Sequence, residues 1–269
     1  MRSILCAFDF TKQSESALIT SYTISRAMDA EFHVVYFISS EVLGLSTPDV
    51  EKSEKEKKIS EFLNSKGISS KIHVQIAKEA IPIEILRLAK EIDAGMIAVG
   101  RSSYDVSDVN FIGSNTLSLK KISEIPLLIG AYKAKDAFKN ILITLNEKSY
   151  SLDPLSFGIK LSKNTDAKLH LLNVIESPYP VALEERELQE AKVRQNIKDY
   201  EPFLKEVEHS LSIIVSESAS KGILEYANNN EIDLIMMSRK KSLNLIERLL
   251  YSSTTLRIMR GTIVPVILF

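Results

Sequence analysis

The chain has 269 residues, of which 45% are hydrophobic and 26% are charged. This composition is typical of soluble globular proteins and excludes collagen-like, disordered and coiled-coil proteins. Its 34 basic and 35 acidic residues give a net charge of −1, which predicts no general affinity for nucleic acid or for a membrane surface. No apolar run reaches the roughly 18 residues of a transmembrane helix, so we expect a cytoplasmic protein.

In chain order, the first half alternates short apolar runs with segments of helical periodicity. Near-continuous apolar runs are typical of strands buried on both faces of a parallel sheet. The segments between them place apolar residues at helical spacing. The predicted strands are 3–8, 31–38, 71–76, 96–99 and 126–131, and the predicted helices are 14–28, 50–66, 80–93 and 114–123.

Two helices carry specific expectations about their buried faces. In the third helix, Ile83 belongs to the predicted apolar face and Glu84 to the polar face. In the second half, residues 183–208 are predicted to form one charged helix. Its candidate inward residues are Leu188, Val193, Ile197, Leu204 and Val207.

The second half repeats the first. The run from Ile4 to Asp9 returns as Ile141 to Asn146, and the segment 29–35 returns as 166–172, both at an offset of 137. The closing segment 125–129 returns at an offset of 139 as 264–268. Matched segments in the same order predict two homologous domains, 1–135 and 139–269. Each is predicted to be a doubly wound α/β domain with a five-stranded parallel sheet.

Single residues fit this arrangement. Cys6 is the only cysteine, which excludes an intramolecular disulfide and a cysteine-based zinc site, and it is predicted to be a buried strand residue. His33 and His170 occupy equivalent positions of the two repeats, and we interpret both as residues packed in the sheet. The last strands of the domains, 127–131 and 266–269, are candidate edges that we expect to pair with each other, making the chain an internal pseudo-dimer.

Three segments of the first domain could carry chemistry. Asp9 follows the first strand, residues 100–103 follow the fourth, and residues 113–116 open a helix. Glycine at a strand end lets backbone N–H groups approach an anion, and a helix N-terminus adds free amides and the positive end of its dipole. The pattern predicts a phosphate clamp, with Asp9 accepting a hydrogen bond from a ribose or a base. A turn with a helix N-cap at Ser114 would explain the same residues without a ligand.

On these segments the chain resembles a tandem universal stress protein, a family with the adenine-nucleotide alpha-hydrolase-like fold. Its ATP-binding members carry Gly-x2-Gly-x9-Gly-(Ser/Thr), and this chain keeps that spacing with Ser103 in place of the second glycine. The resemblance implies a nucleotide site in the first domain, and Phe37 matches the residue that packs beside adenine. The implied site residues are Ala7, Asp9, Phe37, Gly100, Ser102, Ser103, Gly113, Ser114, Asn115 and Thr116.

The chain also departs from the family pattern. A side chain at Ser103 would obstruct a close approach to phosphate, and Asp105 and Asp108 would repel a triphosphate unless a divalent cation such as Mg²⁺ intervenes. In the second domain all three glycines are replaced, and Tyr251 and Asn146 stand at the positions of Gly113 and Asp9. A nucleotide is therefore expected in the first domain only.

The leading hypothesis is a stress-response regulatory module that binds ATP, with or without Mg²⁺, in its first domain and hydrolyses it slowly or not at all. The alternative is a nucleotide-free interaction scaffold of the same fold, with a partner protein or a second copy of the chain as its ligand. A true enzyme would need a cleft of clustered, pKa-perturbed groups. No P-loop, zinc-protease or nucleophile-elbow motif occurs in the sequence.

Overall fold

The computed structural model describes residues 1–39, 47–102, 111–145, 153–238 and 254–269. The chain divides into two compact units, Met1–Asp136 and Ala137–Phe269. Among the described residues, no helix is both long and apolar enough to cross a membrane.

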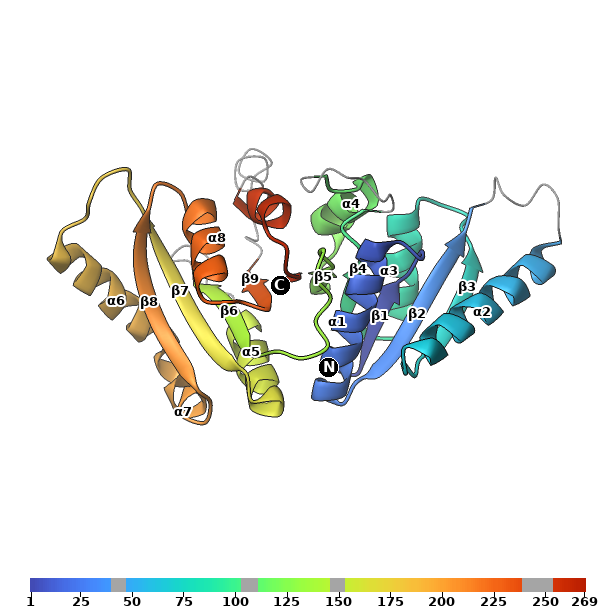
Figure 1. The fold of residues 1–269 in the computed structure, drawn as a ribbon, viewed down its shortest axis with the longest axis horizontal. Coiled ribbons are helices and arrows are strands. Elements are labelled where there is room, and N and C mark those ends of the chain that lie inside the picture. The colour runs from blue at the N-terminus through green and yellow to red at the C-terminus, as the bar shows by residue number, and fades with distance from the viewer. Residues whose placement is uncertain (40–46, 103–110, 146–152, 239–253) are drawn as a thin grey trace. The chain divides into compact units, whose positions relative to one another are not determined.

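Unit 1 is a parallel sheet of five strands in the order β3-β2-β1-β4-β5, with a helix in each connection (Figure 1). Right-handed crossovers place α1 and α2 on one face of such a sheet and α3 and α4 on the other. The elements are β1 (Ser3–Ala7), α1 (Lys12–Met28), β2 (Glu31–Ile38), α2 (Pro48–Ser65), β3 (Lys71–Ile76), α3 (Ile81–Glu91), β4 (Ala94–Val99), α4 (Ser114–Ile122) and β5 (Leu127–Ile129).

Unit 2 repeats this design with the strand order β8-β7-β6-β9-β10, again all parallel. A further helical segment covers 254–261 before the last strand. The elements are β6 (Asn140–Leu145), α5 (Asp153–Thr165), β7 (Lys168–Glu176), α6 (Leu183–Ile197), η2 (Lys198–Tyr200), α7 (Glu201–Leu204), β8 (His209–Ser216), α8 (Ala219–Asn229), β9 (Leu234–Met237) and β10 (Val266–Leu268).

The backbone repeats in detail as well. Asp29 and Asp166 both have a left-handed backbone, with φ of 50° and 56°, and Asp93 and Glu231 share a second such position with φ of 51° and 49°. Non-glycine residues seldom adopt this conformation, so its recurrence at offsets of 137 and 138 marks equivalent turns. The two α/β domains with parallel sheets that the sequence predicts are therefore confirmed.

The central strands are buried on both faces, as their apolar sequences predict. Cys6 in β1 is fully buried, and burial raises the pKa of its thiol to about 12, so the thiol is inert at neutral pH. His33 in β2 and His170 in β7 are also buried, with 4% and 5% of their surfaces exposed. Their predicted place within the sheet is confirmed.

The expected polar face of α3 was wrong at its first turn. Glu84 is 4% exposed, whereas Ile83 is 40% exposed. Glu84 Oε1 accepts hydrogen bonds from the backbone N–H groups of Lys78 and Glu79, at 3.0 and 2.9 Å, and Oε2 accepts one from Arg87. The carboxylate is buried because it satisfies backbone donors that precede the helix.

The expected single helix over 183–208 was also wrong. It breaks into α6, η2 and α7, because a proline at position 202 has no N–H and its ring clashes with the preceding turn. Val193 and Ile197 are buried, and so is Leu204, but Leu188 is 57% exposed. Leu188 precedes Val193 by five positions, which is about 140° around the helix at 3.6 residues per turn, so Leu188 faces away from the buried side of α6.

Candidate functional site

The turn from β1 to α1 holds Asp9 at the end of the first strand. Asp9 Oδ1 accepts hydrogen bonds from the Thr11 N–H at 3.1 Å and from the Thr11 hydroxyl at 2.6 Å. Thr11 in turn caps α1, since its Oγ1 accepts from the N–H of Ser14 at 3.2 Å. Asp9 is exposed, and its Oδ2 has no partner within the described ranges, so one carboxylate oxygen is available to a ligand.

Gly100, directly after β4, lies against the first turn of α1. A Cβ at this position would approach Ser14 N to 2.7 Å and the carbonyl carbon of Gln13 to 3.0 Å. Contacts below 3.0 Å with backbone atoms are not tolerated, so this strand end needs a glycine for packing alone. The same close approach brings the end of β4 next to the Asp9 turn.

Hydrogen bonds join the two halves of the glycine motif, which are the segments 100–102 and 113–116. The N–H of Gly113 donates to the carbonyl of Arg101 at 2.9 Å, and the hydroxyl of Thr116 donates to the carbonyl of Gly100 at 2.8 Å. A Cβ on Gly113 would lie 3.2 Å from Cα of Ser102, so the two backbones are in contact. The structure therefore brings Gly100 and Ser102 together with Gly113 and Thr116.

What remains for a ligand is the N-terminus of α4. Gly113 is its N-cap residue, and no side chain caps the helix there. The N–H groups of the first helical residues have no partner within an α-helix, so those of Ser114 and Asn115 can bind an anion. Ser114 is exposed and Asn115 half-buried, whereas the N–H of Gly113 and the hydroxyl of Thr116 are already used.

The other predicted site residues lie at strand ends. Ala7, the last residue of β1, pairs with Val35 on one side and with Val99 on the other, and it is half-buried. Phe37 in β2 is also half-buried and pairs with Gln75 of β3.

Several predicted features fall on residues outside the described ranges. In unit 1 these are Ser103, Asp105 and Asp108. In unit 2 they are Asn146 and Tyr251. The replaced glycine motif of unit 2 can therefore be compared with unit 1 only through Ser238, its first residue.

Arg101 belongs to this site although it occupies one of the unspecified positions of the glycine motif. Its side chain is 1% exposed, and its guanidinium carbon lies 5.5 Å from the centre of the Tyr132 ring. Burial lowers the pKa of the Arg101 guanidinium below its ordinary value, while Tyr132 acts in the opposite direction. A buried positive charge in the segment 100–102 favours an anion nearby. An arginine inside a glycine motif was the available signal, but the sequence does not say which way it points.

A second missed feature is an aromatic cluster beside Asp9. The ring of Phe10 lies 4.7 Å from that of Phe8, 5.9 Å from Tyr36 and 6.0 Å from Phe62, between ring centres. Phe10 has φ of 66° and is 42% exposed. In this position it offers a flat apolar surface next to the Asp9 carboxylate.

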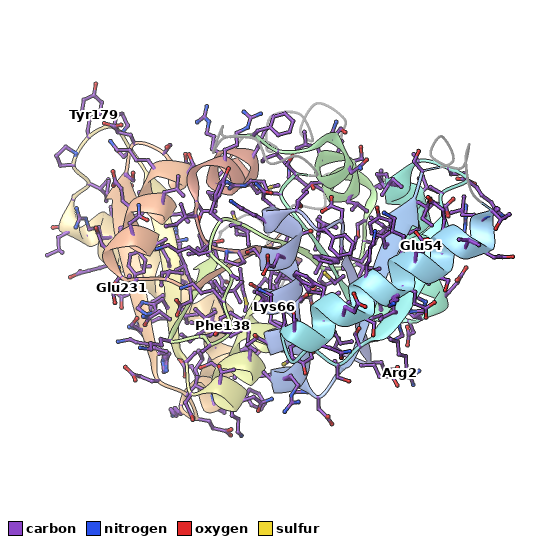
Figure 2. The ribbon with its side chains drawn as sticks, turned by 45° about the vertical axis from the view of Figure 1, so that its right-hand side comes forward. Arg2, Glu54, Lys66, Phe138, Tyr179 and Glu231 are labelled. Carbon is purple, nitrogen blue, oxygen red and sulfur yellow. The ribbon has the colours of Figure 1, made fainter. Side chains whose placement is uncertain are left out.

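Two lysines border the aromatic cluster. The ammonium of Lys55 lies 5.3 Å from the centre of the Tyr36 ring, and that of Lys66 lies 5.5 Å from the centre of the Phe62 ring. Lys66, labelled in Figure 2 at the end of α2, also forms an ion pair with Glu15 of α1 at 2.5 Å. The two lysines thus link the cluster to α2, and Lys66 also links it to α1.

Unit 2 has no such cluster at the equivalent place within its described residues. Asn173 stands at the position of Tyr36 and is 3% exposed. Its amide donates to the Leu145 carbonyl at 2.8 Å and accepts from Gln189 of α6 at 3.1 Å. Hydrogen-bonded polar side chains thus occupy in unit 2 the place of an aromatic surface in unit 1.

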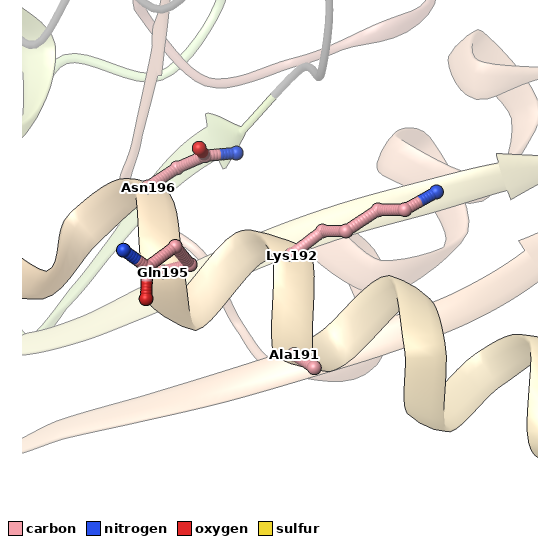
Figure 3. A pocket seen from close by; sticks show the side chains of 4 residues that line it. All are labelled: Ala191, Lys192, Gln195 and Asn196. Atoms are coloured by element: carbon pink, nitrogen blue, oxygen red, sulfur yellow. The ribbon is translucent and has the colours of Figure 1, made fainter.

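A hollow elsewhere on the surface does not belong to this site. It has a volume of about 440 Å³ and lies on α6, lined by Ala191, Lys192, Gln195 and Asn196 (Figure 3). All four residues are exposed, and Lys192 is the one ionisable side chain among them. The described residues also contain no group of three or more His, Cys, Asp or Glu that could hold a metal ion.

Known structures of the same size share this fold. A universal stress protein from Archaeoglobus fulgidus DSM 4304 is 16% identical, with a TM-score of 0.69 over 99% of this chain and 95% of that chain. A functionally unknown protein from Pseudomonas aeruginosa PAO1 is 15% identical, with a TM-score of 0.72 over 100% of this chain and 92% of that one. A shorter structure, a universal stress protein in complex with cAMP, is 15% identical and matches 49% of this chain and 97% of its own, with a TM-score of 0.40. A search of curated proteins found no match.

A comparison with family models identifies the family to which the chain belongs. The model of the universal stress protein family matches the chain twice, over residues 1–129 and over residues 137–269. Together these ranges cover nearly the whole sequence and coincide with the two units of the structure. The chain belongs to the universal stress protein family, with two of its domains in tandem.

Proposed function

We propose that unit 1 binds an adenine nucleotide, ATP, between the Asp9 turn and the N-terminus of α4, and that the chain is a cytoplasmic stress-response regulator rather than an efficient ATPase. One observation carries the proposal: the start of α4 has no side-chain cap, so the N–H groups of Ser114 and Asn115 stay open beside the end of β4, to which hydrogen bonds of Gly113 and Thr116 join the helix. The resemblance to ATP-binding members of the family implies that the two halves of the glycine motif grip the phosphates.

Each part of the nucleotide has a counterpart in unit 1. The N–H groups and side chains of Ser114 and Asn115 can hold phosphate oxygens, with the helix dipole and the buried Arg101 cation adding favourable charge. The free Oδ2 of Asp9 can accept a hydrogen bond from a ribose hydroxyl or an adenine amino group. Phe37 and the exposed ring of Phe10 offer apolar surface for the base.

Slow turnover is part of this proposal. A general base must be free to take a proton from the attacking water. Asp9 Oδ1 holds Thr11 and the start of α1, which restricts movement of the carboxylate toward an attacking water. Binding would then act by stabilising one state of the chain.

Titration calorimetry with ATP and Mg²⁺ tests the proposal. Ser114→Asp places a carboxylate where the phosphates should lie, and it should weaken binding at least tenfold because like charges repel. Ser114 is exposed at the first position of α4, where an acidic residue favours the helix, so the variant should fold. Ser252→Asp, the equivalent change in the second domain, is the matched control and should leave the affinity unchanged.

The alternative is a nucleotide-free scaffold, and one observation favours it. The N–H of Gly113 and the hydroxyl of Thr116 are satisfied by carbonyls of the chain itself, so the motif is stable as a turn without a ligand. This alternative predicts no heat with nucleotide up to millimolar concentration and no difference between the two serine variants. That outcome would overturn the proposed nucleotide site.

A further inference from the structure

Two histidines face each other across the outer strands of unit 1. His33 Nδ1 in β2 lies 2.9 Å from His73 Nε2 in β3, and the two ring planes are only 10° apart. At this distance one nitrogen must carry a hydrogen and the other must not. His33 is 4% exposed, and His73 is half-buried on the edge strand β3. The contact is one of the side-chain links between these two strands.

Glu31 determines which nitrogen carries the hydrogen. Its Oε2 lies 3.3 Å from His33 Nε2 and accepts from Lys71 Nζ at 2.8 Å. The hydrogen bonds from Lys71 and His33 lower the pKa of Glu31, so it stays a carboxylate in mild acid. A carboxylate only accepts, and therefore Nε2 of His33 donates to it. In the neutral pair Nδ1 of His33 is then the acceptor, and Nε2–H of His73 is the donor.

This arrangement accepts one proton but not two. The first proton can bind Nδ1 of His73 and leaves the 2.9 Å hydrogen bond intact. The second would have to bind Nδ1 of His33, which would set two N–H donors and two positive charges against each other. Lys71 on β3 adds a further repulsive charge to His73, while Glu91 at the end of α3 is attractive. Burial, His33 and Lys71 together lower the pKa of His73.

Unit 2 has a histidine at the equivalent position without this conflict. His170 Nδ1 lies 3.1 Å from the hydroxyl of Tyr226, and its Nε2 lies 3.1 Å from Oδ1 of Asn140. Both partners are oxygens that can accept, so a protonated imidazole keeps both hydrogen bonds. Burial lowers the pKa of His170 as well, but its protonation opposes no donor.

We propose that the His33–His73 pair is an acid-sensitive latch that supports the backbone ladder between β2 and the edge strand β3 and favours local opening of β3 when both imidazoles are protonated. A released strand lets both histidines take protons near their ordinary pKa of about 6.5, whereas the latched pair takes only one. The released state thus binds more protons, so latching is complete above this pH and weakens as the pH falls below it. One extra proton changes the opening equilibrium by up to about tenfold per pH unit.

Hydrogen exchange of the full chain between pH 7.5 and 5.0, corrected for the intrinsic exchange rate, tests the latch. Opening of peptides covering β2 and β3 should rise up to about tenfold per pH unit below pH 6.5. In His73→Gln the amide can donate to neutral His33 through its N–H or, turned over, accept from protonated His33 through its oxygen, so protonation of His33 meets no opposing donor and this rise should fall at least threefold. His170→Gln is the matched control and should leave the response of β2 and β3 unchanged.

An unchanged rise in His73→Gln, or no rise in the unmodified chain, would overturn the latch. Should His73→Gln fail to fold, NMR titration of the four histidine side chains in the unmodified chain decides the matter. The latch requires His33 and His73 to titrate in two separated steps, and two independent titrations near pH 6.5 would contradict it. Neither result depends on whether unit 1 binds nucleotide.

Discussion

Gly100 shows how one residue can satisfy a sequence motif for a packing reason. The motif predicts a glycine that lets backbone N–H groups approach a phosphate. The structure shows that the same glycine lets α1 approach the end of β4, because any Cβ would meet the backbone of Gln13 and Ser14. A glycine at this position is therefore expected with or without a ligand, and it is weak evidence for nucleotide binding by itself.

Gly100→Ala should lower the free energy of unfolding by about 1–3 kcal/mol, because α1 must move to admit the methyl group. Urea denaturation followed by circular dichroism in nucleotide-free buffer measures the change. Gly67→Ala is a useful comparison: no atom lies within 4 Å of its Cβ position, and its φ of 66° alone should cost about 1 kcal/mol. A neutral Gly100→Ala would mean that α1 packs more loosely than its contacts indicate.

At the scale of elements, one buried carboxylate, that of Glu84, stabilises the start of α3. Glu84 joins the loop before the helix to Arg87 within it, and Arg87 also forms an ion pair with Glu79 at 2.8 Å. This network fixes the start of α3 after the edge strand β3. Sequence periodicity places Glu84 on the solvent face, and only the loop geometry explains its burial.

Glu84→Ala should destabilise unit 1 by about 2–4 kcal/mol, because two backbone N–H groups and a guanidinium lose their acceptor. Glu84→Gln keeps a carbonyl acceptor for the N–H groups but loses the charge and the acceptor for Arg87, so it should recover about half of that loss. Thermal unfolding of the two variants gives the comparison. Equal losses would show that the charge pairing with Arg87, rather than the backbone hydrogen bonds, stabilises the helix start.

The aromatic cluster of unit 1 and Asn173 of unit 2 show how equivalent elements diverge. β2 and β7 have the same place in their sheets, yet one carries Tyr36 beside Phe10 and the other a buried amide bonded to α6. The difference between Tyr36 and Asn173 does not disturb the strand, because each side chain contacts the helix that follows it. Lys55 of α2 lies over the Tyr36 ring, and Gln189 of α6 donates to Asn173. The difference does decide that β2 contributes a ring to the aromatic cluster while β7 contributes a hydrogen-bonded amide.

For the whole molecule, the difference between the two repeated units predicts that a nucleotide stabilises one unit and leaves the other unchanged. If ATP binds unit 1 only, saturation at 100 times Kd should stabilise that unit by about 2.7 kcal/mol. Hydrogen exchange by mass spectrometry should show added protection in peptides from Met1–Asp136, centred on 94–102 and 111–122. Larger protection in peptides from Ala137–Phe269 would instead place the nucleotide in unit 2.

Much of this protein could be predicted from the sequence alone. Repeated segments at a nearly constant offset predict two domains, and runs of apolar residues predict the strands and helices of each. The spacing of Gly100 and Gly113 indicates the family. These signals are local: periodicity and spacing are properties of neighbouring residues, and any tertiary arrangement of the fold must respect them.

Only the tertiary structure decided which groups are already satisfied. The hydrogen bond of Thr116 to Gly100 joins residues 16 positions apart, and the contact of His33 with His73 joins residues 40 positions apart. The burial of Arg101 and Glu84 is likewise set by segments that meet only in the folded chain. Hydrogen bonding and burial act through space between distant residues, and for that reason a one-dimensional pattern can name the site residues but cannot tell which of their donors remain free.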